Sequence, residues 1–176
     1  MKLKINLVLL LIATVFNCSE LDKLTEFDIT EDFDTTIEIS IPDNDGGKAV
    51  ALSESSSIDI SSNEEINKNL DLIQDITINS LTYEVSNFTG AENATITNAI
   101  LSIGDISIEV SDINLKQSDD NNTVYNIESP NELKNIATYL RNNSAATITL
   151  SGELSATPVT FKIKINIDST FTIDVI

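Results

Sequence analysis

The stretch that decides the fold is VTFKIKINIDSTFTIDV, residues 159–175. Its apolar residues occupy odd positions and alternate with polar ones, which is the two-residue period of a strand with one buried face. A two-residue turn at Asp168 and Ser169 would bring opposite faces of two strands together, so either a three-residue loop or an uninterrupted strand remains. We favour one strand, because such a loop prefers a glycine that this stretch lacks. We expect it to bend near Asp168, because a straight run would span about 55 Å.

The same alternation recurs near the start of the chain, with apolar residues on odd positions: Phe27, Ile29, Ile37, Ile39 and Ile41. Turn-forming residues follow at 42–47, PDNDGG. Residues 53–62 are rich in serine and acids, which predicts a short edge strand or a mobile loop. Slips in the alternation at 79–80 and at 111–112 indicate β-bulges.

A first hairpin is predicted around Gly104 and Asp105. Glycine at the first of two loop residues suits a type II′ turn. This register places three apolar pairs on one face of the hairpin: Ile103 with Ile106, Leu101 with Ile108, and Ala99 with Val110.

A second hairpin is predicted around a four-residue loop at 155–158, SATP. Its apolar pairs would be Leu154 with Val159, Leu150 with Ile163, and Ile148 with Ile165. Gly152 would then lie opposite Phe161 and leave room for the aromatic ring.

Two short helices are expected between the strands. The first covers about Glu64 to Gln74, with capping-box spacing between Ser62 and Glu65 and with Asn63 as a rival cap. The second follows SPNE at 129–132, an S-x-x-E box with proline at the first helical position. Apolar residues at three- and four-residue steps would pack each helix on the sheets: Ile66, Leu70 and Ile73 in the first helix, and Leu133, Ile136, Ala137 and Leu140 in the second. The predicted fold is therefore mainly β, an antiparallel β-sandwich or partly closed barrel with two short helices.

Residues 1–18 have the features of an export signal. Lys2 and Lys4 precede an apolar run at 5–15, and Val15-Phe16-Asn17-Cys18 ends in the only cysteine of the chain. The segment resembles the signal peptide and lipobox of a bacterial, Bacteroidota-like outer-membrane lipoprotein, with Phe16 and Asn17 where that family usually has small residues. The alternative is an ordinary secretory signal cleaved nearby. A membrane-spanning helix is not expected, because it needs roughly 20 apolar residues and the run at 5–15 is shorter.

The resemblance implies that Cys18 becomes the lipidated first residue of the mature protein. Two or three acyl chains hold a protein at a bilayer effectively permanently, because burial contributes about 0.8 kcal/mol per methylene. Ser19 after the cysteine implies sorting to the outer membrane, and Glu20 and Asp22 beside Lys23 resemble the acidic tether of surface-exposed lipoproteins. Whether the protein faces the periplasm or the cell surface stays open. The expected organisation is a signal peptide at 1–17, a lipidated cysteine and acidic tether at 18–25, and a single β-rich domain at 26–176.

The charge of the chain excludes one class of partner. The net charge is −18, and removal of Lys2 and Lys4 with the signal makes it −20, because no acidic residue precedes Cys18. Such a field repels phosphate backbones, so nucleic acid is not expected as a partner.

The residue types argue against catalysis. The chain has no histidine, which excludes Ser-His-acid triads and histidine metal sites. Paired carboxylates that hydrolyse glycosides usually work beside aromatic sugar platforms, and this chain has no tryptophan and three tyrosines. We therefore predict no enzyme, no catalytic residue and no cofactor.

Metal binding is not expected either. Asp43-Asn44-Asp45-Gly46 resembles part of a calcium loop, but Ile41 occupies the first ligand position and Leu52 stands where a bidentate glutamate should close the loop. Residues 119–122, DDNN, fit a solvated connection between a strand and a helix better than a site. We predict no metal ligand.

The function expected from these features is that of a non-catalytic, lipid-anchored envelope lipoprotein that acts as a binding or accessory module. The membrane would be its partner through the acyl chains, and an envelope protein complex is the candidate protein partner. The alternative is a carrier that holds an apolar ligand between sheet and helices, which the isoleucine-rich strands and the helical stripes suggest.

Overall fold

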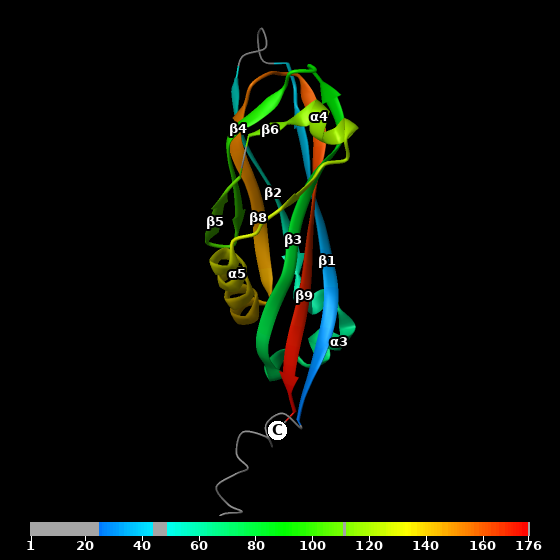
Figure 1. Cartoon of the computed structure of the whole chain (residues 1–176), viewed down its shortest axis with the longest axis vertical. Helices are drawn as coiled ribbons and strands as arrows, with labels where there is room; N and C mark the ends of the chain where they lie inside the picture. The colour runs from blue at the N-terminus through cyan, green and yellow to red at the C-terminus, as the bar shows by residue number, and fades with distance from the viewer. Residues whose placement is uncertain (1–24, 44–48, 111, 176) are drawn as a thin grey trace, which may run out of the picture.

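The computed structural model describes residues 25–43, 49–110 and 112–175, and in this part of the chain two antiparallel sheets pack face to face (Figure 1). Sheet A has the order β1-β9-β3-β7: β1 (Glu26–Ile41), β9 (Val159–Asp174), β3 (Ile73–Gly90) and β7 (Val124–Asn126). Sheet B has the order β2-β8-β4-β5, and β6 also pairs with β4: β2 (Val50–Asp59), β8 (Ala145–Leu154), β4 (Thr95–Ile103), β5 (Ile106–Glu109) and β6 (Ile113–Asn114). The predicted β-sandwich is confirmed. The partly closed barrel is not, because these strands form two separate sheets.

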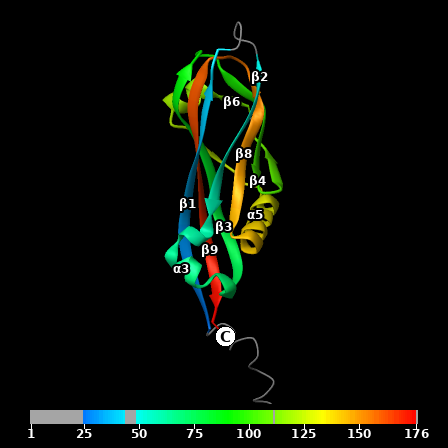
Figure 2. The same ribbon diagram turned by 180° about the vertical axis from the view of Figure 1, so that it is seen from behind.

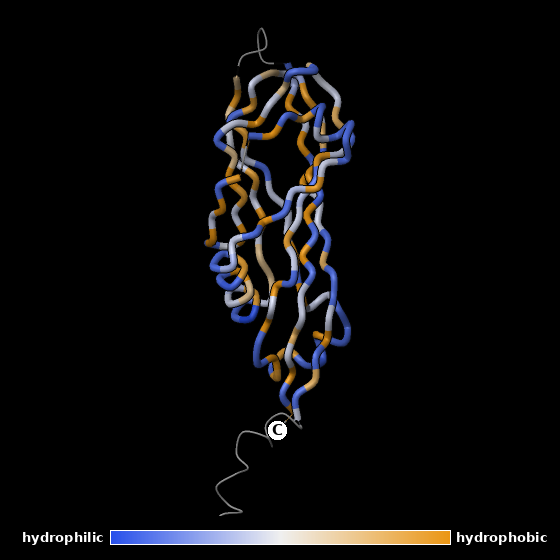
Figure 3. Tube along the Cα trace, in the orientation of Figure 1, coloured by the Kyte–Doolittle hydropathy of each residue, from blue (hydrophilic) through white to orange (hydrophobic). Residues whose placement is uncertain are grey.

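Sheet A is built around β9, which continues through Asp168 without a loop. Its register with β1 is unbroken from Val159 opposite Ile41 to Asp174 opposite Glu26. The apolar residues of β9 face the core and are at most 2% exposed: Val159, Phe161, Ile163, Ile165, Ile167, Phe171 and Ile173. Figure 3 shows the resulting alternation of hydropathy along the strands. The single long strand is confirmed.

The bulge predicted at 79–80 is also present. It lies in β3, whose register against β9 shifts between Ile78 and Ser80. The slip at 111–112 has a different cause, because β5 ends at Glu109 and β6 begins at Ile113. That slip marks a break between two strands and not a bulge within one, although residue 111 itself lies outside the described residues.

The Gly104–Asp105 hairpin is confirmed pair by pair. β4 and β5 place Ile103 opposite Ile106 and Leu101 opposite Ile108. The backbone N–H of Val110 donates to the carbonyl of Ala99 at 2.9 Å, which extends the predicted register.

The second predicted hairpin is wrong. Residues 155–158 do connect β8 to β9, but β8 lies in sheet B and β9 lies in sheet A. The alternation of apolar residues fits a hairpin within one sheet and a crossing between two facing sheets equally well, because both put the same face of each strand in the core. Gly152 accordingly lies against β4 and not opposite Phe161: a Cβ added to it would be 2.9 Å from the Thr97 carbonyl oxygen.

The first predicted helix is shorter than expected. α3 (Glu64–Lys68) begins after Asn63, whose side chain accepts hydrogen bonds from the backbone N–H groups of Glu65 at 2.9 Å and Ile66 at 3.0 Å. The rival cap is therefore the correct one, and the hydroxyl of Ser62 instead donates to the Asp59 carbonyl. The short helical turns η2 (Ile60–Ser62) and η3 (Leu70–Leu72) flank α3, and β3 takes up the remaining residues.

The second predicted helix is α5 (Pro130–Asn143), with Ser129 at the N-cap and Ile136, Ala137 and Leu140 buried. The Ser129 side chain makes no cap hydrogen bond, and its carbonyl accepts from the Leu133 N–H at 3.1 Å. A third helix, α4 (Leu115–Asp120), was not predicted. Its cap is Asn114, and it includes residues 119 and 120, which were expected in a solvated connection.

The two open sides of the sandwich are closed in different ways. On one side β1 meets the edge strand β2, where the Thr35 hydroxyl lies 2.7 Å from that of Ser56 and donates to the Ser57 carbonyl at 3.0 Å. On the other side α5 contacts both β3 of sheet A and β5 of sheet B (Figure 1). The edge strand predicted within residues 53–62 is confirmed as part of β2, which is ten residues long.

The sandwich is elongated, and the described chain starts and finishes at one end of it, which we call the base (Figures 1 and 2). There the Val175 N–H donates to the Thr25 carbonyl at 3.2 Å. The connections from β3 to β4 and from β8 to β9 lie at the opposite, distal end (Figure 1).

We expect Gly152→Ala to lower the free energy of unfolding by about 1–3 kcal/mol, because overpacking forces neighbours to shift. The added methyl group would lie 2.9 Å from both the Ile96 side chain and the Thr97 carbonyl oxygen, and the latter belongs to the backbone. Urea unfolding measures the change. Ser151→Ala, on the half-buried neighbouring residue, is the matched control and should stay within about 0.5 kcal/mol. Equal effects of the two substitutions would contradict the close contact between β8 and β4.

Candidate functional site

The predicted site residue, Cys18, lies outside the described residues, and so do residues 44–46 of the calcium-like sequence. In residues 25–43, 49–110 and 112–175, no group of three or more acidic side chains is placed to hold a metal ion. None of the described helices is long and apolar enough to cross a membrane. The Asp119 carboxylate accepts from the Phe88 backbone N–H at 2.9 Å, so this acid joins α4 to β3.

An apolar groove that could serve as a binding site lies between α5 and β3, with a volume of about 360 Å³. We call it the α5–β3 groove. Its lining combines residues 75–78 of β3 with residues from one face of α5: Pro130, Leu133, Lys134, Ala137 and Thr138.

The α5–β3 groove exists because β7 is short. β7 pairs only with Thr82 to Glu84, so the part of β3 that lines the groove has β9 on one side and, among the described strands, none on the other. α5 crosses this open edge, and the Arg141 guanidinium donates to the Gln74 carbonyl at 2.8 Å. The groove therefore places apolar side chains beside the backbone of an unpaired strand edge, an arrangement that can receive an extended chain or an apolar ligand.

The space between the two sheets is filled by side chains. A residual void enclosed by six residues has no room for a water molecule: Tyr83, Leu101, Val110, Ile113, Leu150 and Ile163. A ligand at this position would have to displace core side chains packed at interior density. The α5–β3 groove is consequently a better place for an apolar ligand than this part of the sandwich interior.

A second, more polar groove of about 830 Å³ lies on the other side of α5. Its lining offers carboxylates, amides and hydroxyls, including Asp105, Glu132 and Asn142. The groove forms where the β4–β5 turn meets the helix: Gly104 lies under the Tyr139 ring, and a Cβ there would come within 2.3 Å of it. These groups can make hydrogen bonds to a polar partner.

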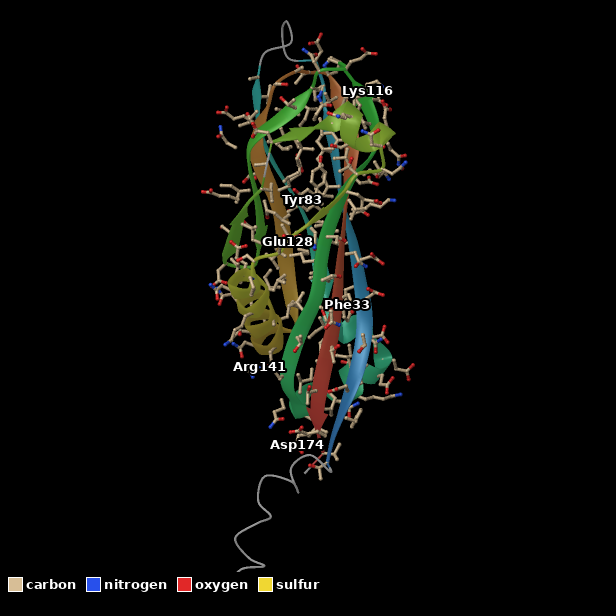
Figure 4. All side chains as sticks on the ribbon, in the orientation of Figure 1. Phe33, Tyr83, Lys116, Glu128, Arg141 and Asp174 are labelled. Atoms are coloured by element: carbon tan, nitrogen blue, oxygen red, sulfur yellow. The ribbon has the colours of Figure 1, made fainter. Side chains whose placement is uncertain are left out.

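The aromatic pair Tyr83 and Tyr125 links sheet A to α4. The rings stack at a centroid distance of 4.9 Å, and the Tyr125 hydroxyl lies 2.6 Å from that of Ser118. Tyr83 lies within the sandwich (Figure 4). Burial, and then the neighbouring Tyr125, raises the pKa of Tyr83 to about 12.

Three exposed groups have pKa values shifted by ion pairs. A hydrogen bond from Lys162 lowers the pKa of Glu38. Hydrogen bonds to Asp120 and Glu84 raise the pKa values of Lys116 and Lys164. Each shift favours the charge that the group already carries at neutral pH, so these groups are not poised for proton transfer there.

Comparison with known proteins gives no family. No protein-family model matches the chain, and no curated protein matches it. Among solved structures the chain is similar to Desmodium yellow mottle tymovirus, at 11% identity over 85% of this chain and 84% of that one, with a TM-score of 0.35. It is also similar to the decameric BFDV capsid protein, at 9% identity over 83% and 98% with a TM-score of 0.38, and to turnip yellow mosaic virus, at 12% identity over 85% and 82% with a TM-score of 0.32. Likeness at this level assigns neither a fold family nor a function to this chain.

The raised pKa of Tyr83 makes a pH-dependent contribution to stability. The unfolded tyrosine ionises near 10 and the folded one near 12, so stability is fully present below pH 10 and is lost as the pH rises towards 12. At 1.36 kcal/mol per unit, we expect the wild type to lose about 2 kcal/mol more than Tyr83→Phe between pH 8 and pH 12. Urea unfolding at both pH values measures this difference, and the values at pH 6 and 8 give the pH-independent cost of the substitution. Equal losses in the two proteins would contradict the buried phenol.

Proposed function

We propose that this chain is a lipid-anchored lipoprotein of the outer membrane that acts as a non-catalytic binding or accessory module for an envelope complex. The observation that carries the proposal is the position of Thr25, which lies at the base of an elongated sandwich (Figure 1). Thr25 follows Cys18 by seven residues, and seven extended residues reach at most about 25 Å. An anchor at Cys18 would therefore keep the base close to the membrane.

This attachment would direct the distal end away from the bilayer. The 16 residues of β9 run between the two ends and span about 50 Å. The strand connections and α4 at the distal end would then stand where a partner in the envelope can reach them. The two grooves beside α5 would be accessible along the side of the module.

The charge of the chain supports the same arrangement. With the signal removed the net charge is −20. Carboxylates on an exposed surface repel anionic head groups and keep a protein soluble. Covalently attached acyl chains would hold such a body at a bilayer without a basic patch.

We expect Cys18→Ala to abolish the membrane attachment and to leave the fold intact. Cys18 carries the only thiol of the chain, so the substitution removes one attachment point and no other cysteine chemistry. Phase separation in Triton X-114 should place the native protein in the detergent phase and the variant in the aqueous phase. Ser19→Ala, which keeps the cysteine, is the control. A native N-terminal peptide without fatty-acid mass would overturn the anchor.

The accessory role has its own test. Protein isolated from gently solubilised membranes with the native anchor should bring a reproducible partner of defined stoichiometry. Substitutions in the two grooves beside α5 would then map the contact, with Thr77→Arg in β3 for the α5–β3 groove and Asn142→Arg in α5 for the polar groove. A protein that is always isolated alone would overturn the accessory role and leave the anchor standing.

A second candidate function is the transport of an apolar ligand, which the α5–β3 groove favours. Ile76, Ile78 and Leu133 give this groove an apolar lining next to an open strand edge. Pockets of such composition bind ligands through buried apolar area. A groove of about 360 Å³ has room for a segment of an apolar ligand such as an acyl chain. It has no room to enclose a large lipid on all sides.

We expect organic extraction of protein purified from its native membrane to release a stoichiometric apolar molecule if the carrier function is correct. Ala137→Leu adds bulk to the groove and should reduce the extracted amount severalfold. Ala145→Leu, on an exposed residue of β8, is the control and should leave it unchanged. An empty extract from the native protein would exclude the carrier function.

A further inference from the structure

Three of the large apolar side chains that the described residues expose gather at the base. The exposed ones are Phe27 at 41%, Leu72 at 41%, Val124 at 60% and Val175 at 54%. Phe27 lies opposite Ile173 of β9, and Ile173 lies opposite Ile73, the residue after Leu72. Val175 follows β9 directly and is bonded to the backbone of Thr25. We call Phe27, Leu72 and Val175 the apolar base.

The apolar base is exposed because sheet A is longer than sheet B. β1 and β9 have 16 residues each, whereas β2 and β8 have ten. The core face of sheet A thus extends beyond sheet B, and the segment that contains α3 lies at this level with Ile60 and Ile66 in the core (Figure 2). Phe27 lies closer to the end of the base than this segment, so its side chain is left exposed. It shares a face with Ile29, which is only 6% exposed.

The apolar base is also the part of the domain nearest to the proposed anchor. This step rests on the proposed lipidation of Cys18, from which Thr25 is at most about 25 Å away. The fourth exposed side chain, Val124, lies elsewhere: it pairs with Glu84, which is eleven residues along β3 from Ile73, or about 35 Å. The tether therefore holds three of these four apolar side chains close to lipid and the fourth away from it.

We propose that the apolar base docks onto the bilayer that holds the acyl chains and inserts into its headgroup region. Apolar side chains at an interface bind by burial of area at the boundary between head groups and acyl chains. The tether supplies a high local concentration of lipid, so a small patch is sufficient. Carboxylates flank the patch, among them Glu26, Asp28 and Asp71, and they favour a zwitterionic surface over an anionic one.

The absence of tryptophan from the chain gives a direct test. Phe27→Trp and Leu72→Trp each introduce a single indole into the apolar base, and Val124→Trp introduces one at the exposed control position. The lipidated full-length variants are purified from membranes and added to phosphatidylcholine vesicles with and without doxyl-labelled lipid. We expect the two base variants to show a blue shift and a loss of emission through doxyl quenching. We expect the Val124→Trp protein to keep aqueous, unquenched emission.

The outcomes separate this proposal from the proposed anchor. Vesicle flotation reports the anchor, so a chain that does not float overturns both the lipidation and the docking that rests on it. A chain that floats while both base indoles stay unquenched overturns the docking alone. Equal quenching of the Val124→Trp protein overturns it too, because the domain would then lie flat on the membrane. A blue shift that is already present without vesicles, from coverage by residues 19–24 or by a second copy, also overturns it.

The preference for a zwitterionic surface is tested with vesicles that contain an anionic lipid. Replacement of half of the phosphatidylcholine by phosphatidylglycerol should reduce the quenching of Phe27→Trp at low salt, and added salt should restore it, because salt screens the repulsion by the flanking carboxylates. Quenching that increases with phosphatidylglycerol would overturn the zwitterionic preference.

Discussion

The burial of one face of β9 is the constraint on which the rest of the structure depends. β9 is the strand between β1 and β3, and it pairs with both of them over most of its length. Full burial of a valine, isoleucine or phenylalanine side chain contributes about 1.5–3 kcal/mol, and β9 buries seven such residues. β1 follows β9 in perfect register, whereas β3 shifts its register at three points. The irregularities that shape sheet A therefore lie in β3, and two of the three flank the residues that line the groove.

The parts of the fold that could be predicted are those decided by neighbouring residues. Gly104 and Asp105 fix their own turn and thereby the pairs that follow, and Pro130 marks the start of α5. The first helix was predicted too long because its apolar spacing continues past Asn69 to Ile73, which instead begins β3. The β8–β9 connection could not be predicted, because the same alternation serves strands that are paired in one sheet and strands that face each other across a core.

The candidate sites depend on features that local sequence does not contain. The α5–β3 groove requires that β7 stop after three residues, which leaves part of the β3 edge open. The apolar base requires that sheet A extend beyond sheet B. Phe27 and Ile29 share the same alternation in the sequence, and only the length of the opposite sheet makes one exposed and the other buried.

The place of β9 in the chain has a consequence for the order of folding. β1 and β3 are separated along the chain by β2 and α3, yet in sheet A they are joined only through β9, the last described strand. Contacts of such high contact order form late, because the loops that they close are long. Sheet A cannot assemble until the ribosome has supplied its middle strand. β1 and β3 of a nascent chain thus stay without their common partner during synthesis, and a chain exported as proposed above would reach a translocation channel with sheet A still unformed.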